Sequence, residues 1–387
     1  MTLMKKKDII LFCILTVLFW GGQYAYVPTL TPYAKSIGST VQMIGFIGST
    51  YGLMQLILRI PIGIFSDIQR KRKPCVILGI SFVSLSGVCF LLLKTPIGAL
   101  IARSLAGIAS SFWAIFAVMF ASYFKDQVRG IGILNACQSL GMVVATLIGG
   151  AVSQKIGATA PFVITAALGF MGIAIALMLK DDKSIVSGVK LSDLYDIIKN
   201  KGVVFFSLLG MLLQFVSFGT AYVFTPLIAK NLGAGDAQLG ILTFLFMLPG
   251  VFASLLIGSK LFKRIGFRNV FSVSFLLIAV TSIPIALVKS IHLLFVLQFI
   301  AGFGYGTCST GLLSLVVSSI PNEKKATATA FYQAIYALGM FIGPVFTGLS
   351  SNGKSFFTPY AILGIISTGA AAATIIFFDK VHKTGLD

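Results

Sequence analysis

Long runs of apolar residues, separated by short polar segments, recur along the whole chain. Each run holds 19 or more residues, and a helix of that length can cross a hydrocarbon core of roughly 30 Å. We count twelve runs, at residues 9–30, 41–65, 74–93, 96–122, 130–153, 158–179, 202–229, 237–259, 269–288, 291–319, 325–350 and 356–379. This pattern predicts an all-α membrane protein with twelve transmembrane helices.

A spaced set of small residues occurs twice, in the same helical register and 198 residues apart. The first copy consists of Gly132, Gly141, Ala145-Thr146 and Gly149-Gly150, and the second of Ala330, Gly339, Gly343-Pro344 and Gly348. Polar positions repeat with them, because Asn135 and Gln138 correspond to Gln333 and Tyr336. Small residues let helices approach closely in a membrane. The repeat therefore predicts two six-helix pseudo-repeats that meet through smooth helix faces.

The longest polar connection, residues 180–201, separates the sixth run from the seventh. It contains the amphipathic pattern of a short helix on the membrane surface, formed by Ser192, Leu194, Tyr195, Ile197 and Ile198. We therefore expect three parts: an N-terminal half at 1–180, a cytoplasmic linker at 181–201 and a C-terminal half at 202–387.

The composition excludes an ordinary soluble protein. Hydrophobic residues make up 57% of the chain and charged residues 11%, with a mean hydropathy of +0.97. This is far more apolar surface than one soluble core would use.

The positive charges predict the orientation, because cytoplasmic loops retain lysine and arginine. With both termini inside, the inside segments hold 22 of the 30 basic residues and the outside loops hold 6. The six are Lys35, Lys94, Lys155, Lys230, Lys289 and Lys354, one in each outside loop. We expect a multi-pass protein of the plasma or inner membrane with both termini cytoplasmic. The net charge of +19 then reflects this topology and attraction to anionic lipids, not binding of nucleic acid.

Residues that carry covalent chemistry do not cluster. The five cysteines are scattered, the two histidines are isolated, and no nucleotide-binding signature occurs. A metal site or a catalytic triad needs several such residues at defined spacing. We therefore expect no metal, no cofactor and no enzymatic activity, and we expect a monomer.

Three motifs at demanding spacing point to a family. The loop after the second run reads Gly63, three residues, Asp67 and then a basic cluster from Arg70, and early in the fourth run Arg103 is followed four residues later by Gly107. The glycine series of the fifth run is the third motif. Together they resemble the major facilitator superfamily over essentially the full length of the chain.

The resemblance implies two six-helix halves that rock around a midplane cavity. It implies a breakable latch on the cytoplasmic side at Gly63, Asp67 and Arg70. It also implies helix faces along which the halves close, at Gly141, Gly149, Gly339, Gly343 and Pro344. In this family the glycine series of the fifth helix is associated with antiporters and exporters, although Ala145-Thr146 here replaces its central Gly-Pro pair.

Charge inside the membrane indicates the kind of ligand. An arginine there costs roughly 2.5 kcal/mol or more, so Arg103 should face water, a partner or a ligand. All eleven acidic residues fall in loops or at the ends of runs, so no run carries the buried carboxylate of a proton-coupled exporter of cationic drugs. The cavity should then be positive and favour anionic or neutral ligands. Whether Arg59 lines it or braces the latch stays open.

The candidate substrate-binding residues are polar positions near the middle of the runs, namely Gln23, Arg103, Asn135, Gln138, Gln214, Gln333 and Tyr336. A buried glutamine can also simply bond between helices, so we predict these residues as a group.

Taken together, the sequence predicts a secondary active transporter that works by alternating access. We expect an exporter or antiporter of a small anionic or neutral amphipathic compound, with a proton as a candidate coupling ion. Three alternatives stay open: an importer of an organic anion, a multidrug exporter, and a membrane sensor that uses a transporter fold without transport.

Overall fold

The computed structural model describes residues 3–69, 71–180, 191–256, 260–321, 324–351, 353 and 355–383. Twelve helices in this part of the chain are long and apolar enough to cross a membrane, which confirms the predicted number. The helical elements are α1 (Leu3–Tyr24), α2 (Val27–Ser36), α3 (Val41–Gln69), α4 (Lys73–Leu92), α5 (Pro96–Ser111), α6 (Trp113–Ala121), α7 (Gln127–Ile156), α8 (Ala160–Met178), α9 (Leu191–Lys199), α10 (Lys201–Ser217), η1 (Phe218–Tyr222), α11 (Thr225–Asn231), α12 (Asp236–Leu256), α13 (Lys260–Ile265), α14 (Phe267–Leu287), α15 (Ile291–Ser318), α16 (Lys325–Ser350) and α17 (Phe357–Lys383).

The first and seventh spans are interrupted at similar places. The first breaks between α1 and α2, and the seventh passes through the π-helical turn η1 before α11 begins. Pro28 and Pro226 lie in the first turns of α2 and α11, where a missing N–H costs nothing and the fixed φ favours a helix start. Apolar periodicity alone does not reveal such breaks, because both sides of each break are equally apolar.

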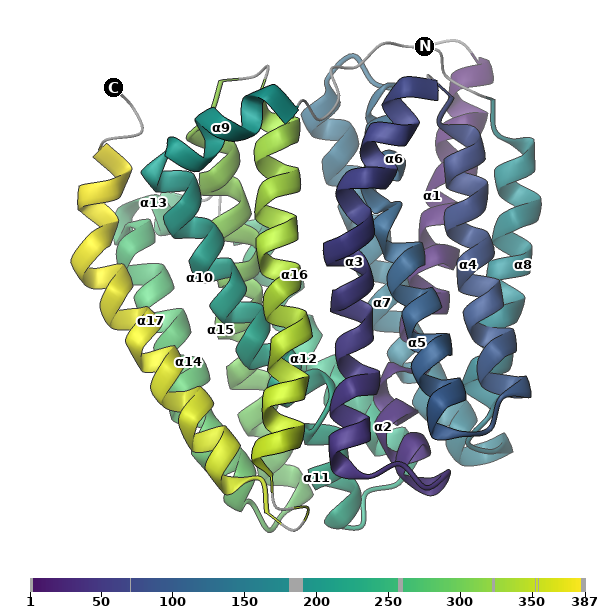
Figure 1. Cartoon of the computed structure of the whole chain (residues 1–387), viewed down its shortest axis with the longest axis vertical. Coiled ribbons are helices and arrows are strands. Elements are labelled where there is room, and N and C mark those ends of the chain that lie inside the picture. The colour runs from purple at the N-terminus through teal and green to yellow at the C-terminus, as the bar shows by residue number, and fades with distance from the viewer. Residues whose placement is uncertain are drawn as a thin grey trace.

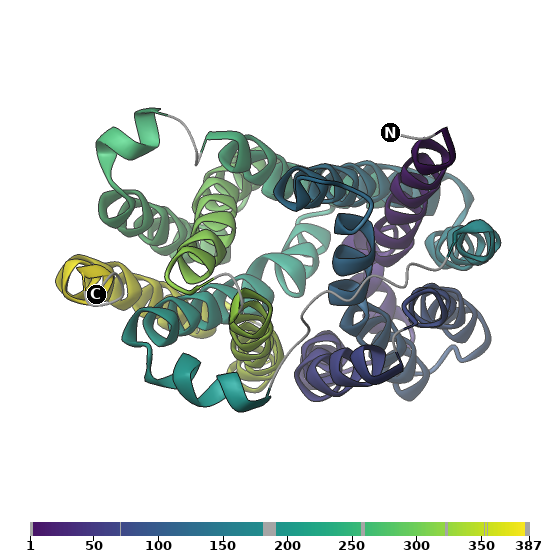
Figure 2. The same cartoon turned by 90° about the horizontal axis from the view of Figure 1, so that it is seen from above.

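The helices form two groups that face each other. Figure 1 shows α1 to α8 on one side and α10 to α17 on the other, with both termini at one end of the molecule. We call these groups the N-terminal and C-terminal halves, and we call the end at α2 and α11 the distal end. Between the halves, α3 packs against α16 and α7 packs against α12. Figure 2, seen from the end that carries the termini, shows the same two groups.

Glycines set the close helix approaches inside each half. A Cβ on Gly141 would lie 2.7 Å from the carbonyl oxygen of Val17 in α1, and a Cβ on Gly149 would lie still closer to the backbone of Ala25. In the C-terminal half, Gly339 and Gly343 lie against the backbone of α10. The structure thus places these four glycines within the halves, where they hold α7 to α1 and α16 to α10.

The α9 helix lies where the sequence indicates a surface helix. Its Ile197 is buried, and Asp196 forms an ion pair of 2.6 Å with Lys324, just before α16. The hydrogen bond and charge of Lys324 hold the pKa of the Asp196 carboxyl below its ordinary value. Linker residues 181–190 lie outside the described residues.

Candidate functional site

The N-terminal half contains a connected polar network at the middle of its spans. Gln23 on α1 donates to the Ser110 hydroxyl of α5 at 2.8 Å and to the Ala106 carbonyl at 3.1 Å. Ser110 also bonds the Tyr51 hydroxyl of α3 at 2.7 Å. Three helices are therefore joined through one buried serine, and the predicted residue Gln23 is one of its partners.

Arg103 extends this network and has no acidic partner among the described residues. Its guanidinium donates to the Tyr26 hydroxyl at 2.8 Å and lies over the Tyr51 ring, 4.2 Å from the centroid. The side chain is buried, and its Nε has no hydrogen-bond partner among the described residues. No described carboxylate lies within ion-pair distance of it. A buried cation held only by neutral groups keeps a strong preference for an anionic or hydrogen-bond-accepting partner.

Arg59 links the two halves. From α3 it donates to the Tyr336 hydroxyl of α16 at 3.0 Å, to the side-chain oxygen of Gln55, and to the Ser110 carbonyl at 3.4 Å. Tyr336 is one of the predicted binding residues. Arg59 therefore lies against the same serine as Gln23 and Tyr51, and its bond to Tyr336 extends the polar network from one half to the other.

The C-terminal half contributes aromatic rings and an amide. Gln214 on α10 bonds the Tyr305 hydroxyl of α15 at 3.4 Å. Tyr305 in turn contacts the rings of Tyr222 and Phe246. Between the halves, Tyr51 stacks on Phe218 of η1 with an interplanar angle of 10°. The network thus lies beside an aromatic wall that both halves supply.

The remaining predicted residues lie apart from this network. Asn135 is exposed and Gln138 half-buried on α7, and Gln333 is half-buried on α16. No hydrogen bond between described residues joins any of the three to Arg103 or Arg59.

The predicted latch after the second span is only partly described. An added Cβ at Gly63 would meet nothing within 4 Å. The Asp67 side chain and the whole of Arg70 lie outside the described residues, so their contacts are not part of this structure.

Sequence reasoning missed several residues of the site, among them Tyr51, Ser110 and Tyr305. Ser110 follows Arg103 by seven residues, which is two helical turns on the same face, and Tyr305 follows Gln298 by the same interval. Arg103 lies four residues before Gly107, and Gln298 lies four residues before Gly302. Extending this correspondence by two turns would have found both Ser110 and Tyr305.

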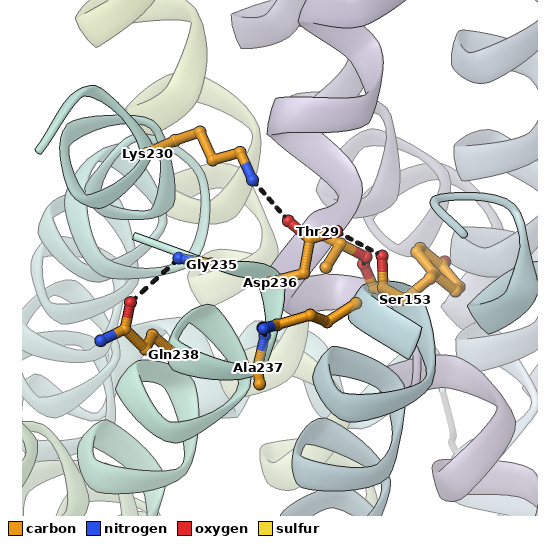
Figure 3. Close-up of polar contacts among 9 residues, drawn as sticks. Thr29, Ser153, Lys230, Gly235, Asp236, Ala237 and Gln238 are labelled. Carbon is orange, nitrogen blue, oxygen red and sulfur yellow. Dashed lines mark hydrogen bonds and ion pairs between the residues drawn. The ribbon is translucent and has the colours of Figure 1, made fainter. Parts of the chain in front are cut away.

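A polar latch closes the distal end. Asp236, the first residue of α12, accepts a hydrogen bond from the Ser153 hydroxyl of α7 at 2.6 Å and pairs with Lys230 at 2.7 Å (Figure 3). The neighbouring Gln154 accepts the backbone N–H of Ala237 at 2.9 Å. This amide has no partner inside its own helix, so α7 of one half caps α12 of the other.

Backbone packing brings the halves together at the same end. An added Cβ on Gly150 of α7 would lie 2.8 Å from the Gly240 Cα of α12. In the matching place, an added Cβ on Gly45 of α3 would lie 2.6 Å from the Pro344 carbonyl of α16. Of the five positions that the family resemblance assigns to closing faces (Gly141, Gly149, Gly339, Gly343 and Pro344), Pro344 meets the opposite half, as do Gly150 and Gly348 of the repeat. Gly132, nearer the termini on α7, has nothing within 4 Å of an added Cβ.

We expect Ser153→Ala to weaken the closure of the distal end. It removes a hydrogen bond to a charged acceptor, worth about 1.5–3 kcal/mol, and leaves the Lys230 pair in place. The population that is open at the distal end should rise about tenfold or more. Distances between spin labels at Lys94→Cys and Lys289→Cys, both exposed in distal loops, measure that population. Ser367→Ala, which removes a buried serine hydroxyl on α17, serves as the control, and equal distance distributions in the two variants would contradict the role of Ser153.

Comparison with known proteins places this geometry in a family. The model of the Major Facilitator Superfamily matches residues 12–227 and 206–386. The chain is 26% identical to an uncharacterized MFS-type transporter, MJ1560, of Methanocaldococcus jannaschii over 94% of this chain and 96% of that protein. It is 21% identical to the quinolone resistance protein NorA of Staphylococcus aureus over 99% of both chains.

Solved structures share the fold. A bacterial homolog of the human lysosomal transporter Spinster, in an inward-facing and unoccupied conformation, superposes with a TM-score of 0.77 at 16% identity, over 100% of this chain and 98% of that one. The nucleoside transporter NupG superposes with a TM-score of 0.74 at 17% identity, over 97% and 99% of the two chains. With the family model matching both halves, twelve spanning helices and these relatives, the chain belongs to the Major Facilitator Superfamily.

Proposed function

We propose that this chain is a secondary active transporter that exports a small anionic or neutral amphipathic solute across the plasma membrane by alternating access. It performs no covalent chemistry. The observation that carries the proposal is Arg103, a buried cation with no described carboxylate beside it. It lies in a polar network that Arg59 and Tyr336 continue into the opposite half.

The geometry supports binding between the halves. A solute that bonds the guanidinium groups on the N-terminal side and packs on Tyr222, Phe246 and Tyr305 on the C-terminal side would contact both halves at once. Movement of one half against the other would then expose it to each side of the membrane in turn. The aromatic rings favour a solute with an apolar part, and the arginines favour one with a negative or strongly accepting group.

The orientation follows from the basic residues, with both termini in the cytoplasm. On this orientation the distal end is extracellular. The Ser153–Asp236 latch and the contact of Gly150 with Gly240 then close the outside. The structure would then be closed to the outside.

A multidrug exporter is the second candidate. The similarity to NorA, named for quinolone resistance, favours it. Against it stands the charge of the site, because two buried arginines repel lipophilic cations. The two candidates therefore predict opposite preferences between anions and cations.

The test is uptake into sealed proteoliposomes of labelled solutes from three matched sets: anionic, neutral and cationic. We expect gradient-dependent transport of members of the anionic or neutral set, and none in liposomes without protein. Transport of cations alone would favour the multidrug exporter. Binding of ligand without any movement across the membrane would make the chain a sensor and end the proposal.

A further inference from the structure

One edge of the Arg103 guanidinium has no protein partner in the described part of the chain. A guanidinium carries five N–H donors in a planar fork, and the edge formed by Nε and Nη2 presents two of them side by side. The one hydrogen bond that Arg103 donates to a described residue starts at Nη1 and goes to the Tyr26 hydroxyl. Nε is buried without a partner. The Nε–Nη2 edge is therefore left for a ligand or for water.

The rings beside Arg103 decide how a ligand can approach this edge. The guanidinium carbon lies over the Tyr51 ring, 4.2 Å from the centroid, and over the Tyr26 ring at 5.6 Å. A ring at these distances fills the space on its side of the guanidinium, so a ligand reaches the free N–H groups in the plane of the fork. A carboxylate suits this approach, because its two oxygens accept two parallel N–H groups of an arginine at once.

Arg59 has no second edge of this kind. Its Nη1 donates to the Tyr336 hydroxyl, and its Nη2 donates to the Gln55 side chain and the Ser110 carbonyl. Among the described residues, its Nε alone has no partner. Arg59 therefore joins the halves and offers a ligand one N–H at most, so the two-pronged contact belongs to Arg103.

Tyr24 connects Arg103 with the aromatic wall. It is buried on α1, and it lies close enough to Arg103, Tyr51 and Tyr305 to interact electrostatically with each of them. Tyr305 belongs to the opposite half, so Arg103 lies near the junction of the halves. A ligand that is held at Arg103 can therefore extend toward the rings of Tyr24 and Tyr305, and a ring of its own would pack well there.

We propose, on the basis of the function above, that the solute is an aromatic monocarboxylate whose two carboxylate oxygens accept the Nε and Nη2 protons of Arg103. A phosphate monoester could reach the same edge, but it carries about two negative charges near pH 7. Burial of the second charge would need a second cation with free donors, and Arg59 has one free N–H. A neutral amide has a single oxygen and leaves one N–H of the edge unpaired.

The experiment measures thermal unfolding of the purified full-length protein in detergent with matched ligands on two ring sizes. For phenyl and for naphthyl, the ligands are the acetate, the acetamide and the methylphosphonate. We expect a saturable rise in Tm with the acetates. The half-maximal concentration of an acetate should be about tenfold or more below that of the amide or phosphonate with the same ring, because only the acetate matches both the charge and the two donors.

Arg103→Lys tests the two-pronged contact itself. Lysine keeps the positive charge but has no rigid planar fork, so the half-maximal concentration of the acetates should rise about tenfold. Arg268→Lys is the matched control, because Arg268 is a surface arginine paired with Asp379, and it should respond as the wild type does. An unchanged response of Arg103→Lys would show that a point charge is sufficient and would overturn the proposal.

The wild type alone can also overturn it. Equal stabilisation by the amides would make the ligand a neutral acceptor, and stronger stabilisation by the phosphonates would make it a phosphate compound. No stabilisation by any of the six would leave the edge to water. If Arg103→Lys fails to fold, equilibrium binding of ¹⁴C-labelled naphthaleneacetate to the wild type, with the unlabelled amide and phosphonate as competitors, ranks the three groups and decides the question.

These binding measurements do not depend on transport, so the ligand class and the proposed function fail separately. Transport of other solutes without binding of the acetates would leave the function intact and end the carboxylate proposal. Binding of the acetates without movement of any solute into proteoliposomes would keep the contact at Arg103 and end the proposed function.

Discussion

Gly150→Leu should hold the two halves apart at the distal end and stop transport. The added side chain has no space, because a Cβ alone would lie 2.6 Å from the Asp236 carbonyl oxygen and 2.8 Å from Gly240. Overpacking of this kind costs about 1–3 kcal/mol. That cost falls only on the closed state, so the ratio of open to closed molecules should rise roughly 5- to 150-fold.

The measurement is the distribution of distances between spin labels at Lys94→Cys and Lys289→Cys, with the native cysteines replaced. Gly132→Leu is the matched control on the same helix, since an added Cβ there meets nothing within 4 Å. It should give the wild-type distribution and wild-type transport. If Gly150→Leu and Gly132→Leu behave alike, the close approach of α7 to α12 does not govern closure.

Arg103→Gln should weaken the response to anions while leaving the protein folded. The substitution places in the N-terminal half the residue that the C-terminal half has at the matching position, Gln298. A hydrogen bond to a charged group contributes about 1.5–3 kcal/mol, so anion affinity should fall by about 10- to 100-fold. Removal of a buried charge without a described carboxylate should leave Tm in the absence of ligand unchanged or higher.

Thermal unfolding with a set of organic anions measures both effects. Ligand at a hundred times its Kd should raise the free energy of unfolding of the wild type by about 2.7 kcal/mol. Arg268→Gln is the control, because Arg268 is a surface arginine paired with Asp379, and it should respond as the wild type does. Equal stabilisation of wild type and Arg103→Gln by anions would show that Arg103 does not bind the ligand. Stabilisation of both by lipophilic cations would favour the multidrug exporter.

The central site shows where sequence reasoning succeeds and where it stops. Gln23 and Arg103 could be singled out because a polar group inside an apolar run is costly and therefore needs a reason. Tyr51, Ser110 and Tyr305 could not be ranked in the same way, because tyrosine and serine are common in membrane helices and carry no comparable cost. Their importance comes from a shared contact between helices far apart in the sequence.

The role of Arg59 illustrates the same limit. Its position four residues before Gly63 suggested either the latch or the cavity, and spacing along one helix does not distinguish them. The hydrogen bond from Arg59 to Tyr336 joins residues that are 277 positions apart in the sequence. Contacts of that kind depend on how the halves pack, which periodicity within a helix does not encode.

The sequence by itself determined the number of spans, their approximate limits and the repeat that relates the halves. Each of these follows from local rules: a span needs a minimum apolar length, and close packing needs small residues at helical spacing. The tertiary structure alone decided which small residues hold a half together and which meet across the halves. It alone decided that Ser153 and Gln154 close the distal end on Asp236 and Ala237, and that Arg59 joins Tyr336. These are pairings between separate helices, and in a uniformly apolar environment many pairings satisfy the same local pattern, so only the assembled geometry selects among them.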